Sequence, residues 1–137
     1  MSPSLIDTDT LSEIIKGRDQ HVLRRAGEYL SVHQRFTFSI ITRYEILRGL
    51  KAKGAPRQIA SFELRCRESI VLPLSDAIVE KASDIYGDLY RTGQLISDAD
   101  ILIAATAMAH GLDLVTENPG HFSRVLHLHT ESWRTSA

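Results

Sequence analysis

Short apolar runs alternate with amphipathic stretches along the chain, and this pattern predicts strands that alternate with helices. The runs that predict strands are residues 4–6, 36–38, 70–72, 112–115 and 125–128. The stretches that predict helices run from residue 11 to Gly17, over residues 19–32, from Ser39 through Leu50, from Pro56 to about Glu68, from Ser75 to Thr92 and from Ser97 to Gly111. Serine before a helical stretch is a typical N-cap, and glycine after one is a typical helix end.

Strands that alternate with helices predict an α/β fold in which a parallel sheet is covered by helices on both faces. The chain has 137 residues, of which 43% are hydrophobic, and it contains no internal repeat or linker. This length allows one proper core, so we expect a single domain over residues 1–137. The lone Cys66 can form no internal disulfide, which fits a reducing cytosol.

The N-terminus lacks the basic and apolar regions of a signal peptide, and the longest apolar run, residues 101–105, is too short to cross a bilayer. We therefore expect a soluble cytoplasmic protein with no membrane contact. The net charge of −1 argues against a nucleic-acid partner. However, residues 43–67 are basic, with seven Lys or Arg against two Glu, so the neutral total hides a basic region. A solvated helix face is the simpler explanation of that region.

In parallel α/β sheets, ligands bind outside the carboxyl ends of the strands, and several polar residues fall there. Asp7 and the segment 116–118 directly follow predicted strands, Glu45 lies in the helix after the second strand, and Asp100 lies in the first turn of a later helix. Each has a structural explanation when taken singly. Asp7, Asn118 and Asp100 suit helix N-caps or first turns, Glu13 completes a capping pattern with Thr10, and Glu45 can pair with Arg48.

Taken together, these residues predict at least three carboxylates at one edge of the sheet. Clustered carboxylates repel one another unless a cation neutralises them. An all-oxygen set of this kind selects a hard ion such as Mg²⁺ or Mn²⁺, which usually acts on phosphates. A carboxylate-held ion can activate water and stabilise charge on a scissile phosphodiester, as in many nucleases.

Five segments together resemble the PIN-domain ribonucleases of the VapC toxin kind. These segments are SLIDTDTL at the start, then ITRYEILRG, ISDADILIAATAMAHG, LVTENPGHFSRV and HLHTESW. The resemblance spans nearly the whole chain. It implies an α/β/α sandwich with a central, mainly parallel sheet and Mg²⁺-dependent endoribonuclease activity. It also implies a toxin–antitoxin pair with a VapB-type antitoxin, and a homodimer.

Carried over by position, the resemblance places the metal-binding acids at Asp7, Glu45 and Asp100, and the fourth catalytic position at Asn118. The fourth position is often aspartate, so Asn118 is expected to orient water or RNA. Asp98 is an extra acid with an accessory or dipole-complementing role, and Asp9 departs from the usual Asn or Ser. Thr116 and Thr8 are expected to support the site. The candidates for RNA phosphate contacts are Arg43, Arg48 and Lys51.

Other features are weaker. His127 and His129 alternate on the predicted last strand without a third metal ligand, His121 lies at the site edge, and Phe122 and Trp133 are expected to pack in the core.

Two alternatives remain open. The segment SLIDTDT also reads as a haloacid-dehalogenase phosphatase motif, with Asp7 as nucleophile and Asp9 as acid/base, although this leaves Glu45 unexplained. A PIN module that binds RNA or protein without catalysis is the other. The closing segment most resembles members that act on transfer RNA, which makes tRNA the favoured substrate.

Overall fold

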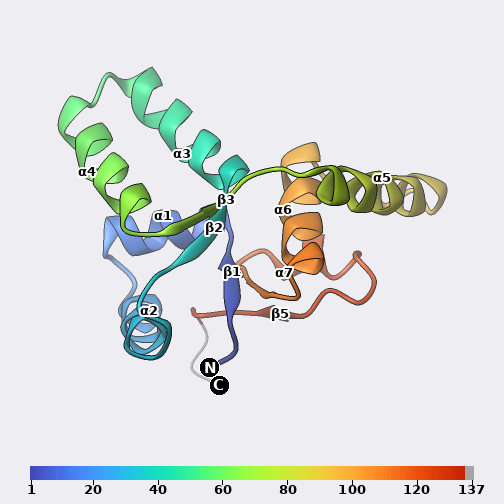
Figure 1. The fold of residues 1–137 in the computed structure, drawn as a ribbon, viewed down its shortest axis with the longest axis horizontal. Coiled ribbons are helices and arrows are strands. Elements are labelled where there is room, and N and C mark those ends of the chain that lie inside the picture. Colours follow the sequence, from blue (N-terminus) through green and yellow to red (C-terminus); the bar gives the residue numbers. More distant parts are fainter. Residues whose placement is uncertain (135–137) are drawn as a thin grey trace.

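The computed structural model describes residues 1–134, and its strands lie between two groups of helices (Figure 1). In chain order the elements are β1 (Ser4–Ile6), α1 (Thr8–Lys16), α2 (Gln20–His33), β2 (Thr37–Ser39), α3 (Ile40–Lys53), α4 (Pro56–Arg67), β3 (Ile70–Leu72), α5 (Asp76–Arg91), α6 (Asp98–Ala109), β4 (Asp113–Val115), α7 (Pro119–Phe122) and β5 (Thr130–Glu131). This order confirms the predicted alternation of strands and helices.

The strands form two parallel groups that meet at β1. One group has the order β1-β4-β5 and the other pairs β2 with β3, while β1 also lies beside β2. Ser4 pairs with Asp113, and Thr37 pairs with Ile70. All three strand pairings are parallel, so the carboxyl ends of β1 and β4 lie at the same edge.

The last strand was predicted wrongly. Residues 125–128 form a turn in which His127 has a φ of 67°, and the strand itself is β5, at Thr130–Glu131. Phe122 and Val125 are both buried, three residues apart, so this apolar spacing belongs to a helical turn rather than a strand. His127 and His129 therefore do not share a strand face.

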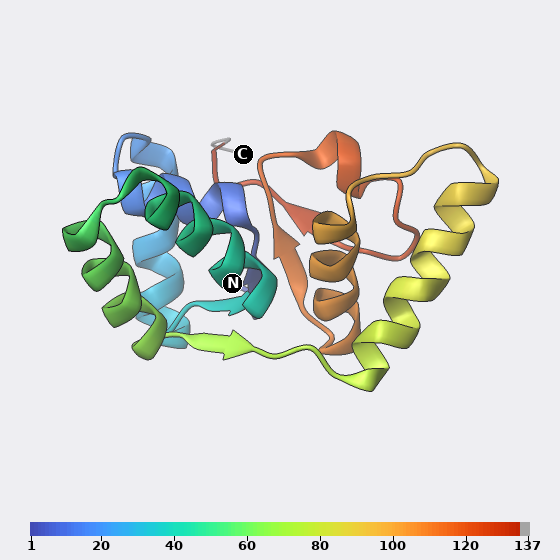
Figure 2. The same cartoon turned by 90° about the horizontal axis from the view of Figure 1, so that it is seen from above.

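Alternate residues of the strands pack into two separate hydrophobic cores. Leu5 and Leu114 belong to a core with α5 and α6, whereas Ile6 and Val115 belong to a core with α1 and α2. Because successive side chains of a strand point to opposite faces, this division places helices on both sides of the sheet, as Figure 2 shows. The predicted α/β/α sandwich is confirmed. Trp133 is fully buried in the second core, as expected.

Side-chain caps start most of the helices that carry site residues. Asp7, Ser39, Ser75 and Ser97 each accept a backbone N–H in the first turn of the helix that follows. One expected cap is wrong, because α1 begins at Thr8 and Glu13 lies inside it rather than in a capping pattern with Thr10. The expected N-cap position of Asn118, with Pro119 at the start of the helix, is confirmed in α7, although the Asn118 side chain makes no capping bond.

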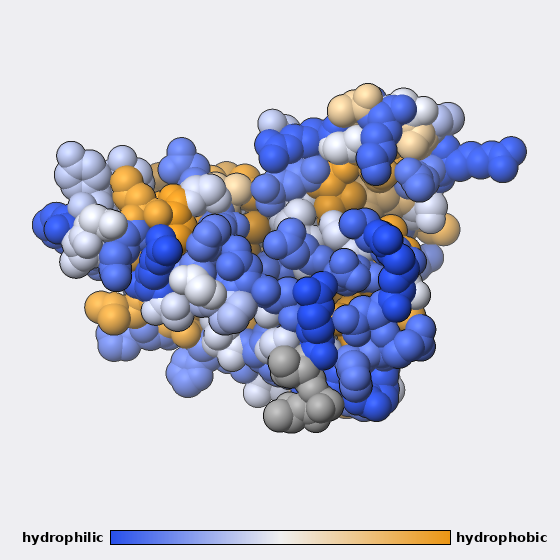
Figure 3. Space-filling model, turned by 180° about the vertical axis from the view of Figure 1, so that it is seen from behind, coloured by the Kyte–Doolittle hydropathy of each residue, from blue (hydrophilic) through white to orange (hydrophobic). Residues whose placement is uncertain are grey.

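Polar side chains cover most of the face in Figure 3, where apolar patches appear toward the end formed by α5. Among residues 1–134, no helix is both long and apolar enough to span a membrane.

Candidate active site

A small cavity of about 80 Å³ opens at the carboxyl ends of β1 and β4, and we call it the acidic cavity. Its lining residues are Asp7, Thr8, Asp9, Glu45, Asp100, Asn118 and Phe122. Asp7, Glu45, Asp100 and Asn118 come from segments far apart in the sequence, and the structure brings all four of them to this cavity, where Asp9 also lies. The expected convergence at one sheet edge is therefore observed.

Asp7 is the most buried acid of the cavity, with 3% of its surface exposed. Its backbone N–H donates to the Val115 carbonyl at 3.0 Å, which joins the end of β1 to β4. Its Oδ1 accepts the Thr10 N–H at 2.8 Å as the cap of α1. Burial raises the pKa of Asp7 to about 6, although hydrogen bonds from Thr116 and Thr10 oppose this shift. In the absence of a cation, this carboxyl is therefore reluctant to ionise.

Glu45 reaches the cavity from α3 and is held there by α1. The Thr8 hydroxyl donates to Glu45 Oε1 at 2.6 Å and lies 3.1 Å from the Thr42 hydroxyl. The expected pairing with Arg48 is present, with Nη2 3.8 Å from Oε2. Thr8 thus supports the site through Glu45 as well as by lying in the turn after Asp7.

Asp100 lies in the first turn of α6, where its backbone N–H donates to the Ser97 hydroxyl at 3.2 Å. Its Oδ2 is 3.2 Å from Nδ1 of His121, and the same nitrogen is 2.9 Å from the Asn118 amide nitrogen. Sequence reasoning placed His121 at the site edge without identifying these partners. The spacing from Asn118, three residues along one helical turn, was the signal that points to them.

Thr116 and Glu117, which directly follow β4, have side chains with different roles. The buried Thr116 hydroxyl accepts the Asn118 N–H at 2.9 Å and bonds Asp7, so it supports the cavity as expected. Glu117 instead fastens the C-terminal segment. Its Oε1 accepts the N–H groups of Trp133 and Arg134 at 3.0 and 3.2 Å, and its Oε2 accepts the Ser132 hydroxyl at 2.7 Å.

Asp98 does not line the acidic cavity, and its accessory role stays a prediction. It lines a separate cavity between α5 and α6, beside Val79 and Tyr86. Residues two positions apart on a helix point in different directions, and Asp100 occupies the direction of the site. The dipole-complementing position of Asp98, in the first turn of α6, is confirmed.

None of the three expected RNA contacts lines the acidic cavity. Arg43 donates to Glu63 Oε1 at 2.8 Å, and this pairing raises the pKa of the guanidinium. Arg43 therefore ties α3 to α4, and its contact with RNA phosphate stays a prediction. Arg48 is exposed and lies 5.0 Å from the centre of the Tyr44 ring. Lys51 is also exposed. Their contact with RNA stays a prediction.

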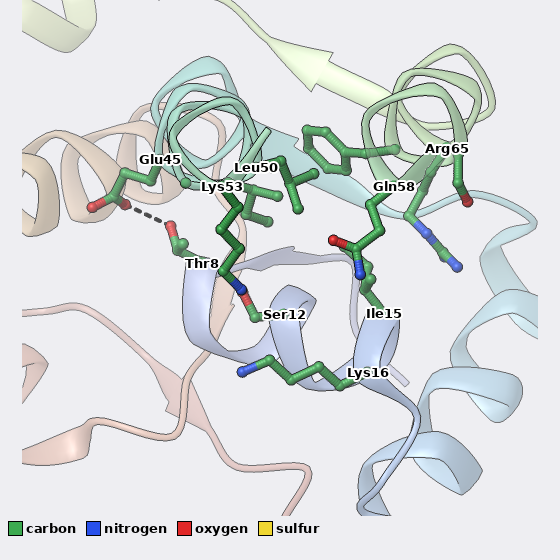
Figure 4. A pocket seen from close by; sticks show the side chains of 13 residues that line it. Thr8, Ser12, Ile15, Lys16, Glu45, Leu50, Lys53, Gln58 and Arg65 are labelled. Carbon is green, nitrogen blue, oxygen red and sulfur yellow. Dashed lines mark hydrogen bonds between the residues drawn. The ribbon is translucent and has the colours of Figure 1, made fainter. Parts of the chain in front are cut away.

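A larger cleft of about 470 Å³ lies between α1 and the α3–α4 pair and shares Thr8 and Glu45 with the acidic cavity. We call it the basic cleft. Its apolar lining is Ile15, Ile46, Leu50 and Phe62, and its cations are Lys16, Lys53 and Arg65. Figure 4 shows Lys53 pointing from α3 toward α1, while Lys16 and Arg65 extend from other sides. The basic run of the sequence contained Lys53 and Arg65, but nothing in the pattern joined Lys16 to them.

The acidic cavity suits a hard cation in its chemistry. Asp7, Glu45 and Asp100 all offer carboxylate oxygen, and the buried Asp7 lacks a cationic partner among residues 1–134. In the described part of the chain, no three carboxylate, histidine or cysteine side chains are already gathered around one point.

Comparison with known proteins agrees with this arrangement. The PIN domain family model matches residues 4–127. The chain therefore belongs to the PIN-domain family. That match includes Glu45 and the whole sheet except β5, so the phosphatase alternative, which leaves Glu45 without a role, is set aside.

Within the family, the chain is similar in sequence to the VapC ribonucleases. It is 32% identical over 130 residues to "Ribonuclease VapC2" of Haemophilus influenzae, covering 94% of this chain and 96% of that one. It is 29% identical to "tRNA(fMet)-specific endonuclease VapC" of Salmonella typhimurium, with the same coverage. The DNA-bound VapBC structure from Salmonella typhimurium aligns with a TM-score of 0.86 and 28% identity, over 97% of this chain and 99% of that chain.

Proposed function

We propose that this protein is an Mg²⁺- or Mn²⁺-dependent endoribonuclease and the toxin of a type II toxin–antitoxin pair. The observation that supports it most directly is the acidic cavity, in which Asp7, Glu45 and Asp100 meet on a PIN fold. Ribonuclease relatives cover almost the whole chain.

In this proposal Asp7, Glu45 and Asp100 hold the cation. A divalent ion there supplies charge stabilisation at the scissile phosphate and activates water for attack. Mg²⁺ fits the all-oxygen donor set, and Mn²⁺ accepts the same ligands. Asn118 carries no charge, so its amide is suited to orienting water or RNA beside the acids. Thr8 and Thr116 keep Glu45 and Asp7 in place.

The basic cleft supports a protein partner, a VapB-type antitoxin. An apolar lining with cations at its rim is complementary to an amphipathic segment that carries acidic residues. Because the cleft shares Glu45 with the acidic cavity, a segment bound there would lie against the catalytic acids. Neighbouring structures include VapBC complexes. A homodimer, implied by the sequence resemblance, stays a prediction.

For the substrate we propose transfer RNA. Two of the matched relatives, from Salmonella typhimurium and Shigella flexneri, are named tRNA(fMet)-specific endonucleases, at 29% identity over 94% of this chain. Recognition of RNA depends on its shape and on unpaired bases, and a folded tRNA presents both.

The deciding experiment is cleavage of purified cellular RNA by the isolated protein with Mg²⁺, with Mn²⁺ and with EDTA. Asp7→Asn and Asp100→Asn are compared with the wild type, and Asp98→Asn serves as the matched control because it lies outside the acidic cavity. We expect discrete fragments that vanish with EDTA and in the first two variants but persist in Asp98→Asn. Absence of cleavage by folded, antitoxin-free wild type would support the non-catalytic binding module instead.

A further inference from the structure

Asp7, Glu45 and Asp100 each accept a hydrogen bond at the acidic cavity, and His121 is a side-chain donor that the proposed mechanism leaves unused. The three pairs are Asp7 with the Thr10 N–H, Glu45 with the Thr8 hydroxyl, and Asp100 with His121. In the first two pairs the donor comes from the start of α1. In the third it comes from α7, a separate element.

His121 is the side chain that fixes Asp100. The Ser97 cap holds only the Asp100 backbone, and among residues 1–134 no side chain other than His121 makes a hydrogen bond to the Asp100 carboxylate. A carboxylate accepts hydrogen bonds but does not donate them, so Nδ1 of His121 carries the proton in this contact. The other carboxylate oxygen, Oδ1, is left free of such bonds.

The position of His121 is itself set by two anchors. Phe122, the next residue, is buried at 1% exposure and lines the same cavity. On the other side, Asn118 is fastened to Thr116 through its backbone N–H. The imidazole is 46% exposed, so it contributes little to the core, and its two recorded polar contacts both go to residues of the site.

We propose that His121 is a positioning residue of the metal site, holding Asp100 through Nδ1 and joining it to Asn118. This inference rests on the proposed function, because it takes Asp100 as a ligand of the divalent ion. The Asn118 amide nitrogen is 2.9 Å from the same Nδ1, and two donors cannot bond each other, so joining Asp100 to Asn118 requires the amide to be turned so that its oxygen accepts the Nδ1–H. Groups that orient a metal ligand typically affect metal affinity about 10- to 100-fold when they are removed.

Two amide substitutions of His121 test which of its ring nitrogens makes the contact with Asp100. In Asn the amide nitrogen is attached to Cγ, as Nδ1 is in histidine, whereas in Gln it lies one bond further out, near the place of Nε2. We therefore expect His121→Asn to keep Mn²⁺ affinity near that of the wild type. His121→Ala and His121→Gln should both weaken it about 10- to 100-fold. His129→Ala, an exposed histidine away from the cavity, is the matched control.

The measurement is Mn²⁺ binding, followed by the electron paramagnetic resonance signal of the free ion, with thermal unfolding of each metal-free variant as a check on folding. Equal loss of affinity in the Asn and Gln variants, or none in the Ala variant, would overturn the proposal. So would a variant that binds Mn²⁺ normally but has a raised KM for RNA, because His121 would then touch substrate.

Asp100→Asn distinguishes this proposal from the proposed function. If the wild type binds Mn²⁺ and Asp100→Asn abolishes binding, the proposed metal site is supported independently of the result for the His121 variants. If the wild type binds no Mn²⁺, the metal site itself fails, and the His121 proposal fails with it. In the double variant Asp100→Asn with His121→Ala, we expect no further loss beyond Asp100→Asn, since both act through one ligand.

Discussion

At the scale of the residue, Asp7 combines burial with a charge that nothing in the described chain neutralises. Its pKa is raised from 3.8 to about 6, while in the unfolded chain it keeps the lower value. Between those two pH values the folded state holds the proton more tightly than the unfolded state. The contribution of Asp7 to stability is therefore fully present below pH 3.8 and is lost as the pH rises through about 6.

Asp7→Asn should consequently stabilise the metal-free protein at neutral pH. A shift from 3.8 to about 6 corresponds to about 3 kcal/mol. The asparagine carbonyl oxygen can still cap α1 by accepting the Thr10 N–H. We expect the free energy of unfolding of the variant to equal that of the wild type near pH 4 and to exceed it by up to about 3 kcal/mol at pH 7.5.

Urea unfolding in EDTA at the two pH values measures this difference. Asp9→Asn is the control, because Asp9 borders the same cavity but is exposed. A wild type that is more stable than Asp7→Asn at pH 7.5 without metal would show that the buried charge is not the dominant effect. The same comparison with Mn²⁺ present should favour the wild type, since the ion binds the folded state alone.

The sequence predicts a site residue correctly when the position of that residue at a strand end or helix start determines where its side chain points. Asp7, Asp100 and Asn118 follow strands or begin helices, so their places at the sheet edge could be predicted. Arg43 could not, because its partner Glu63 lies on the next helix and only the packing of α3 against α4 brings them together. Asp98 and Asp100 differ by two positions, and the rotation of α6 decides which of them faces the cavity.

At the scale of the element, helix caps set where the acids stand. The Ser97 hydroxyl accepts the N–H of Asp100 itself, so this cap fixes the first turn of α6 and one acid of the cavity together. Ser75 makes the equivalent cap on α5, at 3.2 Å from the Ile78 nitrogen, but α5 carries no residue of the acidic cavity.

This pair allows a matched test. Ser97→Ala and Ser75→Ala should each lower the free energy of unfolding by about 1 kcal/mol, the usual effect of losing such a cap. Only Ser97→Ala should also weaken Mn²⁺ binding. Chemical unfolding and metal titration of both variants measure the two effects. Equal metal affinity in both variants would mean that α6 holds Asp100 in place without its cap.

The helix starts after Ser39, Ser75 and Ser97 could be predicted because a single serine hydroxyl defines each of them locally, whereas α1 begins at Thr8, earlier than predicted. The final strand could not be predicted. β5 is two residues long and pairs only with β4, through contacts such as the Leu114 N–H to the His129 carbonyl at 2.9 Å. Before it, Val125 and Leu128 pack against the core from a turn, while Leu126 is 71% exposed, so these apolar residues do not form the strand that was predicted there.

At the scale of the whole molecule, the sheet separates two cores, and the basic cleft lies on one side of that division. The basic cleft is built by α1, α3 and α4, which pack against the second core. The acidic cavity lies where those helices meet α6 and α7. A partner in the basic cleft therefore contacts one half of the molecule and reaches the acids of both.

Reversing the charge of the cleft should weaken antitoxin binding. We expect Lys53→Glu together with Arg65→Glu to raise the Kd for the cognate VapB-type antitoxin roughly tenfold or more, since like charges across an interface are unfavourable. Lys51→Glu changes the same charge on α3 outside the cleft and should have little effect. Binding of purified antitoxin at two salt concentrations measures this. Unchanged antitoxin affinity with weakened RNA binding would assign the cleft to RNA.

The hydrogen bonds between Glu117 and residues 132–134 can form only after those residues have been synthesised. The ribosome makes Asp7, Glu45, Asp100 and Asn118 before it makes the segment that Glu117 binds. Glu117 is the immediate neighbour of Asn118, and β5, which lies beside β4, is also made late. This edge of the sheet thus gains these contacts only after residues 130–134 have been made, so a chain that stops after Asn118 lacks them.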